Sequence, residues 1–476
     1  MKWHRREFLQ LGALSTTAAL AGCGSVFEAP ITVNSEVDPD AYDGGLEVAF
    51  VPLAAPVDET TFPLAACAGD LEQSRALVKV HVATSSVVRL RVWREGVTAG
   101  HVVMVHDDLH TADEAGFASV VVGGLAPATR YTYAAFSLDD AGRSDVGTFR
   151  TLFPSDWLAP VHLAGMTCTS WQNQPWQAGQ RIGEENVDLL VHLGDMAYND
   201  DAITLDEYRA NWRRALGDPG YRAALQGAGL AISWDDHEFT NNLNPETLDP
   251  QRLADAKHAF FEALPVSPGP AGQLWRSLRF GRSVEVFVLD CRTERRPSLR
   301  TSAAEAYLGA EQLSWLKAAL TASPCHFKVL LNSVPMSLMP ELWASSGDRW
   351  QGYAPAREEL LQFLEQEQLD DVWFLSGDFH LGFVGRVEAE GPRRCFWEVA
   401  VGPSGNLGNP LGLLAESEEY RQEVFPSSQF LYGKGALAAT FLTFDPVRDV
   451  VRVRFVAADS GVVLFDEELS REVRSL

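Results

Sequence analysis

The first third of the chain alternates apolar and polar residues in short runs. Residues 77–82 (Leu-Val-Lys-Val-His-Val) and 88–93 (Val-Arg-Leu-Arg-Val-Trp) have a period of two, and residues 118–122 and 129–133 follow around a Gly-Gly-Leu-Ala-Pro turn. This period is typical of half-buried β-strands, and several short strands with turns between them favour a β-sandwich. We therefore predict a β-sandwich domain over residues 46–153, and we expect no catalytic residue in it.

From residue 157 onward the pattern changes, because apolar runs of strand length now alternate with segments of helical spacing. The strand-like runs are residues 161–165, 188–193, 230–234, 284–289, 329–331 and 372–375, and the helix-like segments are 311–320 and 357–366. This alternation indicates an α/β domain with strands buried on both faces. We place that domain at residues 157–462 and expect a C-terminal tail at 463–476.

Charge and composition narrow the class of protein. The 476 residues include 39 Lys+Arg and 64 Asp+Glu, which gives a formal net charge of −25. Such an acidic surface repels a phosphate backbone, so duplex nucleic acid is excluded as a partner. A small phosphate-bearing substrate stays compatible with this charge if local cations overcome the long-range field. No apolar run approaches the ~20 residues that a membrane-spanning helix needs.

The N-terminus has the features of an export signal. Residues 1–22 combine a basic start, the pair Arg5-Arg6 and a short apolar stretch, and residues 20–23 read Leu-Ala-Gly-Cys. The paired arginines resemble a twin-arginine signal, and the last four residues resemble a lipobox. We predict a lipoprotein signal peptide at 1–22, lipidation of Cys23 and a tether at 23–45. The alternative is an ordinary cleaved signal with an incidental cysteine.

The remaining cysteines are compatible with an oxidising compartment but do not define a disulfide framework. An odd number leaves at least one thiol unpaired, and the sequence does not say which cysteines pair. The five that follow the predicted lipidation site are Cys67, Cys168, Cys291, Cys325 and Cys395.

Ionisable residues follow several of the buried strands directly. The segments concerned are 194–198 (Gly-Asp-Met-Ala-Tyr), 235–238 (Asp-Asp-His-Glu), 290–292 (Asp-Cys-Arg) and 377–380 (Gly-Asp-Phe-His). Because α/β sheets bind ligands at the carboxyl ends of their strands, we expect these residues to share one site. Carboxylates, imidazoles and a phenol are metal ligands, and two metals ~3.5–4 Å apart can clamp an in-line phosphoryl displacement.

Taken in order, these motifs resemble the alkaline phosphatase D (PhoD-like) family of binuclear metallophosphoesterases. The motifs are Thr167-Cys168, Gly-Asp-x-x-Tyr at 194–198, Trp-Asp-Asp-His-Glu-x-x-Asn-Asn at 234–242, Leu-Asp-x-Arg at 289–292, Leu-Gly-x-Glu-Gln-x-x-Trp-Leu at 308–316, Val-Pro-Met at 334–336, Trp-x-Gly-Tyr at 350–353 and Gly-Asp-x-His at 377–380. The resemblance implies a fibronectin type III-like β-sandwich followed by an α/β (α+β) four-layer metallophosphoesterase sandwich. It also implies an exported hydrolase in which a metal-bound hydroxide attacks a phosphate ester in line.

The resemblance further implies Fe3+ beside Ca2+, with one carboxylate shared between them. Carried over residue by residue, Fe3+ falls to Cys168, Asp195, Tyr198 and His380, and Ca2+ falls to Asp195, Asp378 and Asp236, with Asn242 as the second choice to Asp236. A thiolate, a phenolate and a carboxylate suit a trivalent ion, and an oxygen-only set suits calcium. Zinc is an alternative, because it also binds Cys, His and Asp.

Two further residues are assigned to catalysis. His237 can donate to the phosphoryl oxygen or protonate the leaving group, the alternative being a buttress of the metal site. Arg292 has a guanidinium fork that suits a pair of phosphate oxygens, the alternative being a structural salt bridge. Asn242 is assigned to substrate binding together with Arg292. No Gly-x-Ser-x-Gly elbow supports a covalent route.

Two rival functions remain open at this point. A phosphodiesterase on the same metal centre is favoured by the short insertion between residues 198 and 235, which predicts an open pocket. A non-catalytic surface binding protein is disfavoured by the intact ligand motifs. In each case we expect a monomer whose partners are small phosphate esters and whose membrane contact is a lipid anchor.

Overall fold

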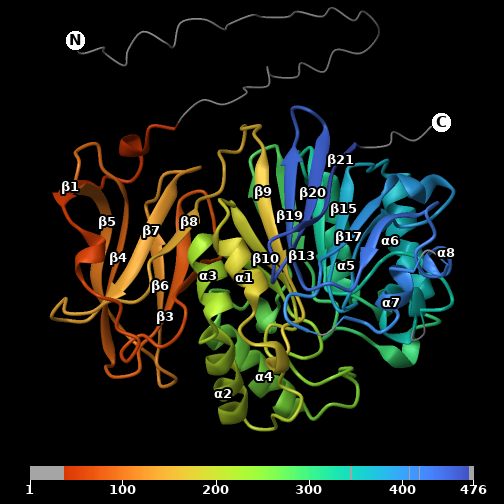
Figure 1. Ribbon diagram of the computed structural model, residues 1–476, viewed down its shortest axis with the longest axis horizontal. Helices are drawn as coiled ribbons and strands as arrows, with labels where there is room; N and C mark the ends of the chain where they lie inside the picture. Colours follow the sequence, from red (N-terminus) through yellow and green to blue (C-terminus); the bar gives the residue numbers. More distant parts are fainter. Residues whose placement is uncertain (1–36, 344–345, 407, 418, 471–476) are drawn as a thin grey trace, which may run out of the picture. The chain divides into compact units, whose positions relative to one another are not determined.

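The computed structural model describes residues 37–343, 346–406, 408–417 and 419–470 (Figure 1). The predicted signal peptide, the lipidation site Cys23 and most of the tether lie outside the described residues. Within these ranges, no helix is both long enough and apolar enough to cross a bilayer.

The N-terminal strands form a five-stranded antiparallel sheet. Its order is β1 (Leu46–Ala49), β5 (His101–Thr111), β4 (Val87–Glu95), β7 (Arg130–Phe136) and β8 (Gly147–Arg150). The period-two pattern at 88–93 and 129–133 thus predicted β4 and β7 correctly. The long strand β5 was missed, because its acidic second half breaks the alternation.

A nine-stranded mixed sheet runs from the N-terminal region into the α/β region. Its order is β21 (Val463–Ser470), β20 (Val450–Ala457), β19 (Ala438–Asp445), β9 (Val161–Met166), β10 (Leu189–Leu193), β11 (Gly229–Ser233), β2 (Cys67–Gly69), β3 (Arg75–His81) and β6 (Phe117–Gly123). β2 pairs in parallel with β11 through Gly69 and Leu230. The predicted boundary near residue 153 therefore does not coincide with a break in this sheet.

A seven-stranded mixed sheet completes the α/β region. Its order is β12 (Arg276–Phe280), β13 (Val284–Val288), β14 (Phe327–Asn332), β15 (Val372–Ser376), β17 (Trp397–Ala400), β16 (Gly382–Arg386) and β18 (Phe430–Lys434). The four central strands β13, β14, β15 and β17 are parallel. Their carboxyl ends therefore lie at one edge of the sheet.

Helices cover the outer faces of both large sheets. On the nine-stranded sheet lie α1 (Gln177–Gly183) and α3 (Pro219–Gly227), and α2 (Leu205–Leu216) packs on α4 (Pro250–Ala263) nearby. The seven-stranded sheet is covered by α5 (Ala310–Ala322) and α6 (Ala354–Gln366), and the short α7 (Gly412–Ala415) and α8 (Arg421–Val424) lie next to β18 (Figure 1).

Strand residues alternate between two cores, which explains the continuous apolar runs. Val286 and Leu331 face the core between the two large sheets, where they join Leu163 of β9. Phe287 of β13 points the other way, into a second core that includes Leu316 of α5. A strand buried on both faces cannot alternate apolar with polar residues. The result is a helix–sheet–sheet–helix arrangement of four layers.

Two predicted boundaries need correction. Residues 463–470 of the expected tail form β21, which pairs with β20 and packs Phe465 against Tyr432. The end of the expected tether is also bound, because the buried carboxylate of Asp43 accepts hydrogen bonds from Arg94 at 2.7 Å and Tyr131 at 3.0 Å. A strand ladder and an aromatic contact hold the first segment, and hydrogen bonds to a buried carboxylate hold the second.

Candidate metal centre

The predicted ligands converge at the carboxyl ends of four strands, β9, β10, β11 and β15. In three groups, one ligand atom from each member lies within 4.8 Å of the others. The groups are Cys168–Asp195–His380, Asp195–Asp236–His237 and Asp235–Asp236–Asp378. Asp195 and Asp236 each belong to two groups, so the three groups form one continuous cluster.

The first group contains the residues predicted to bind iron. Tyr198 extends it, because its hydroxyl lies 3.4 Å from Asp195 Oδ2. Asn406 Nδ2 lies 2.8 Å from the Tyr198 hydroxyl and 3.0 Å from His380 Nε2. The structure thus brings together a thiol, a carboxylate, a phenol and an imidazole. Asn406 was not predicted, since it lies in a loop after β17 that has no recognisable motif.

The second part of the cluster consists of carboxylates. Asp236 and Asp378, both predicted as calcium ligands, lie with Asp235, which was not predicted as a ligand. The backbone N–H of Asn242 donates a short hydrogen bond to Asp236 Oδ2, so the predicted alternative ligand adjoins the chosen one.

The backbone is strained where the cluster forms. Five site residues have positive φ, which non-glycine residues rarely adopt, and only eleven such residues occur in the described part of the chain. The five are Cys168 (54°), Asp195 (57°), Asn242 (54°), Asp378 (60°) and His380 (53°). Each costs of order 1–3 kcal/mol, and such residues persist where the surrounding structure holds them in place for function.

Glycines in the two Gly-Asp motifs allow the loops to approach closely. Gly194 has φ of +90°, and a Cβ on it would lie 2.4 Å from the Cβ and N atoms of Asp235. A Cβ on Gly377 would lie 2.4 Å from Thr167 Oγ1. Any side chain at either position would therefore push apart the loops that carry the ligands.

A buried carboxylate joins the loops after β10 and β11. Glu238 accepts hydrogen bonds from the backbone N–H groups of Asp195 (2.9 Å), Met196 (2.6 Å) and Asp235 (2.7 Å). Burial raises its pKa to about 7 against the effect of these donors. Glu238 thus positions Asp195 and Asp235, and it belongs to none of the three groups of ligand atoms.

Three acids of the cluster lack enough positive charge around them, whereas the charges of Arg292 and His237 outweigh burial and lower the pKa of Asp236. Burial and then the charge of Asp235 raise the pKa values of Asp195 and Asp378 well above their usual range. Burial and the charge of Asp195 do the same for the Cys168 thiol. Such buried anions are stable only with a bound cation or a proton. The donor set therefore fits a metal centre.

The two histidines differ in charge. Burial and the charge of His237 lower the pKa of His380 to about 4, which leaves a neutral imidazole of the kind that binds metals. Burial alone would lower the pKa of His237, but the carboxylates of Asp195 and Asp200 raise it to about 10. His237 Nδ1 lies 2.7 Å from Asp200 Oδ1, and its ring stacks on Tyr198 with centroids 4.0 Å apart.

The position of Arg292 differs from its predicted role in substrate binding. Its side chain is 0% exposed and its donors contact carboxylates on every side. Its guanidinium donates to both carboxylate oxygens of Asp235, from Nε to Oδ1 and from Nη2 to Oδ2 at 2.8 Å. It also donates to Asp348 at 2.6 Å and to Asp378 at 2.8 Å. The guanidinium thus contacts the acids of the cluster, as in the structural alternative, and contact of Arg292 with a phosphate stays a prediction.

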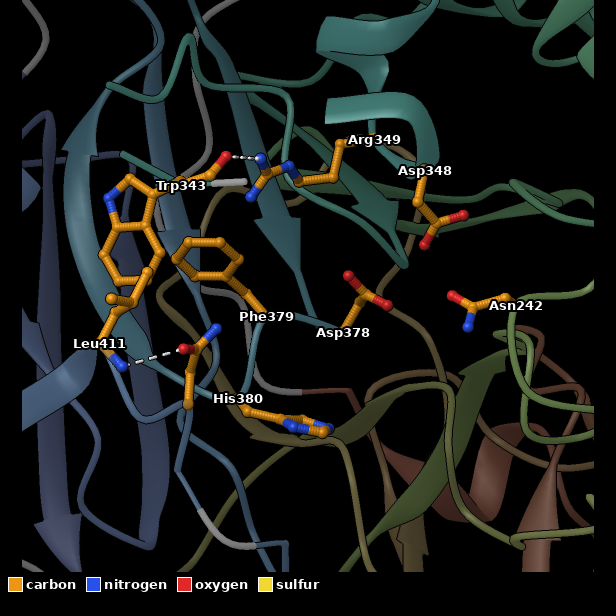
Figure 2. A pocket seen from close by; sticks show the side chains of 9 residues that line it. Asn242, Trp343, Asp348, Arg349, Asp378, Phe379, His380 and Leu411 are labelled. Atoms are coloured by element: carbon orange, nitrogen blue, oxygen red, sulfur yellow. Dashed lines mark hydrogen bonds between the residues drawn. The ribbon is translucent and has the colours of Figure 1, made fainter. Parts of the chain in front are cut away.

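A cavity of about 320 Å³ opens beside this cluster. Figure 2 shows Asp378 and Asn242 on its wall, opposite the rings of Trp343 and Phe379. Its lining is completed by Asp348, Arg349, His380, Asn409 and Leu411. The predicted ligands thus adjoin a space that is large enough for a small substrate.

Among the cysteines that the structure describes, Cys168 alone belongs to the cluster. Cys67, Cys168, Cys291 and Cys325 are buried and form no disulfide. Cys291 donates to Asn332 Oδ1 at 3.0 Å, and burial raises its pKa to about 12, so it is an inert thiol. The fold thus places the thiol of Cys168 among other types of metal ligand.

Comparison with known proteins is consistent with this site. A sequence model of PhoD-like phosphatases matches residues 163–441, a segment that contains every predicted metal ligand. Alkaline phosphatase D of Bacillus subtilis is 25% identical over 294 residues, which cover 52% of this chain and 50% of that protein. The match therefore spans about half the length of that relative.

Solved structures show the same fold. The structure of PhoD superposes with a TM-score of 0.72 at 21% identity, over 87% of this chain and 90% of that chain. Purple acid phosphatase PPD1 from yellow lupin seeds superposes with a TM-score of 0.59 at 12% identity, over 86% of this chain and 75% of that chain.

Proposed function

Because this chain belongs to the PhoD-like phosphatase family, as its motifs predicted, we propose that it hydrolyses phosphate esters at the cluster around Asp195. The observation that carries the proposal is the convergence of three groups of ligand atoms beside a cavity of about 320 Å³. Phosphoryl transfer requires little covalent chemistry from the protein and depends on positioning and electrostatic stabilisation.

Two metal positions follow from the donor types. Cys168, Asp195, Tyr198 and His380 would hold Fe3+, and Asp195, Asp236 and Asp378 would hold Ca2+. When bound, two such cations neutralise charge on the phosphoryl oxygens and lower the pKa of a water molecule. The chain's own contribution is to hold four ligand-bearing loops in fixed positions, through the hydrogen bonds of Glu238 and the left-handed backbone at five site residues.

His237 is the residue that we propose moves a proton. Asp200 is bonded to Nδ1 at 2.7 Å and stabilises the imidazolium, so Nε2 carries the proton that reaches the substrate. Arg292 and Asp348 keep the neighbouring carboxylates oriented. Replacing His237 with Ala should slow turnover by the 10²–10⁴-fold typical of a lost acid while both metals stay bound. Loss of a metal would instead make His237 a ligand or a necessary buttress of the metal site.

A phosphodiesterase is the second candidate. The cavity extends from Asp378 past Asn242 on one side and to Leu411 on the other, so it has room for more than the transferred phosphate. Measuring kcat/KM for matched monoesters and diesters, together with the iron, calcium and zinc content of the purified protein, tests both candidates. A metal-free protein without hydrolase activity would instead support a binding function.

We also propose export by the twin-arginine route and anchoring through lipidated Cys23. The support is the sequence of residues 1–23. Replacing Cys23 with Ser should release the protein from membranes into the soluble fraction with its activity retained. Unchanged membrane association after this substitution would contradict the anchor.

A further inference from the structure

Arg349 differs from the other arginines around the cluster. The guanidinium of Arg292 contacts Asp235, and that of Arg295 contacts Asp348 at 2.7 Å. By contrast, no carboxylate of the described residues forms an ion pair with Arg349, although its side chain is only 5% exposed. The carboxylates of Asp378 and Asp348 act on Arg349 without forming an ion pair with it. A buried cation that no anion contacts is costly unless a ligand supplies one.

The surroundings of Arg349 leave part of its hydrogen-bonding capacity unused. Nη2 donates to the carbonyl oxygen of Trp343 at 3.0 Å, whereas the buried Nε has no partner. The Phe379 ring lies 5.2 Å from Cζ, so one face of the guanidinium is covered by an aromatic group. Figure 2 shows this guanidinium on the cavity wall between Trp343 and Asp378.

The cavity is chemically divided. Asp378 and His380 belong to the proposed metal centre, where the transferred phosphoryl group would bind. Trp343 and Phe379, whose rings are 4.7 Å apart, form an apolar wall with Leu411 on the remaining side. Arg349 is the one cation among the described residues that line the cavity, apart from the titratable His380.

We infer that Arg349 is a specificity residue that binds an anionic group on the leaving-group side of the substrate. The favoured substrates are then phosphate esters whose leaving group combines a planar or apolar body, packed on Trp343 and Phe379, with a carboxylate or a second phosphate at the guanidinium. A guanidinium fork binds either oxyanion with paired hydrogen bonds. This inference rests on the proposed phosphatase function, since it names the substrate class of the same site.

The test compares 4-carboxyphenyl phosphate with the neutral, nearly isosteric 4-carbamoylphenyl phosphate. The wild-type protein should prefer the carboxylate, and Arg349→Gln should lower the ratio of the two kcat/KM values about tenfold to a hundredfold, as expected for a lost charge-assisted hydrogen bond. Arg349→Lys should retain part of the preference. A further comparison uses 4-phosphonooxyphenyl phosphate instead of the carboxylate ester. The substrate with the higher kcat/KM shows whether a second phosphate or a carboxylate is the preferred anion.

A matched control separates this local contact from long-range charge. Arg296→Gln removes the same charge from a residue whose side chain is 41% exposed and paired with Glu305 at 3.3 Å, so the ratio should not change. If Arg349→Gln lowers kcat/KM for both esters equally, Arg349 binds the transferred phosphate or only supports the Trp343 loop, and the inference fails.

Binding of phosphonates gives a readout that does not need turnover. By calorimetry, 4-carboxybenzylphosphonate should bind the wild-type protein more tightly than 4-carbamoylbenzylphosphonate. Arg349→Gln should lose this difference in affinity fully, and Arg349→Lys should lose part of it. If no ester is hydrolysed but this preference is present, the proposed hydrolase function fails and Arg349 still binds the anion. Equal affinity for the two phosphonates would overturn the inference in either case.

Discussion

At the scale of single residues, the cluster combines donors that differ in kind around one shared carboxylate. Asp195 belongs both to the group with Cys168 and His380 and to the group with Asp236 and His237. Removal of a residue on one side should therefore affect one metal before the other. Metal content and colour are consequently more informative about this site than rate alone.

The first prediction separates the two metal positions. His380→Ala should lose iron together with the visible absorption expected of phenolate and thiolate bound to Fe3+, because His380 lies in the group of Cys168 and Asp195. Asp378→Ala should keep the iron and the colour while activity collapses. Elemental analysis and absorption spectra of both variants test this assignment. A colourless, zinc-loaded and fully active wild-type protein would contradict it.

A second prediction concerns the buried His192 on β10. It is 0% exposed, bonded through Nε2 to the Tyr221 hydroxyl at 2.8 Å, and burial lowers its pKa to about 3. In the unfolded chain, His192 has the ordinary histidine pKa of about 6.5. Between about pH 3 and pH 6.5, His192 is therefore protonated in the unfolded chain and neutral in the folded protein. The stability supplied by neutral His192 is therefore present above pH 6.5 and lost as pH falls toward 3.

His192→Gln should remove this acid sensitivity. Between pH 6 and pH 4, the free energy of unfolding of this variant should fall less steeply than that of the wild type. The two slopes should differ by up to about 1.4 kcal/mol per pH unit, the contribution of one proton. Urea unfolding at pH 7, 6, 5 and 4 measures the difference. Equal slopes for the two proteins would show that His192 does not contribute.

Which site residues were predictable depends on whether they follow a buried strand. Asp195 and Asp378 follow β10 and β15 by two residues. The apolar run and the Gly-Asp motif therefore allowed both residues to be predicted as site residues. The sequence left the role of Arg292 open between a phosphate contact and a structural salt bridge, because a free and a salt-bridged guanidinium have the same sequence signature. Asn406 and Arg349 lie in loops without periodicity, and only the folded chain brings them to the site.

At the scale of elements, the loops after β10 and β11 act as one unit. Gly194 lies against Asp235, and Glu238 bonds both loops. The strands themselves were predictable in part, since buried parallel strands with helices between them have a distinctive pattern. The union of β2 with β11 was not predictable, because only a single residue pair of a three-residue strand makes the connection.

The third prediction tests the contact between these loops. Gly194→Ala places a Cβ at positive φ and 2.4 Å from Asp235, so it should destabilise the protein by at least about 1–3 kcal/mol and reduce its metal content. The matched control is Gly123→Ala at the end of β6, where a Cβ would have no atom within 4 Å. Thermal unfolding and metal analysis of both variants measure the effect, and two unchanged proteins would contradict it.

At the scale of the whole molecule, the N-terminal β-region is part of the main framework. β2, β3 and β6 extend the nine-stranded sheet, and their inward residues such as Val78 join the core that contains Leu163. Ion pairs such as Arg150–Asp188 at 2.8 Å also connect the two regions. The strand alternation of this region was visible in the sequence, but strand periodicity does not say which sheet a strand joins.

The last prediction follows from this shared sheet. A fragment that begins at residue 154 would expose the edge of β11 and the apolar surface that β2 and β3 cover, and exposed strand edges promote aggregation. We expect this fragment to be insoluble or aggregated, whereas a chain that begins at residue 37 stays folded. Size-exclusion chromatography and the metal content of the two fragments test this prediction. A monomeric, metal-loaded and active 154–476 fragment would show that the β-region is a separable domain, and that the continuity of the sheet contributes little to stability.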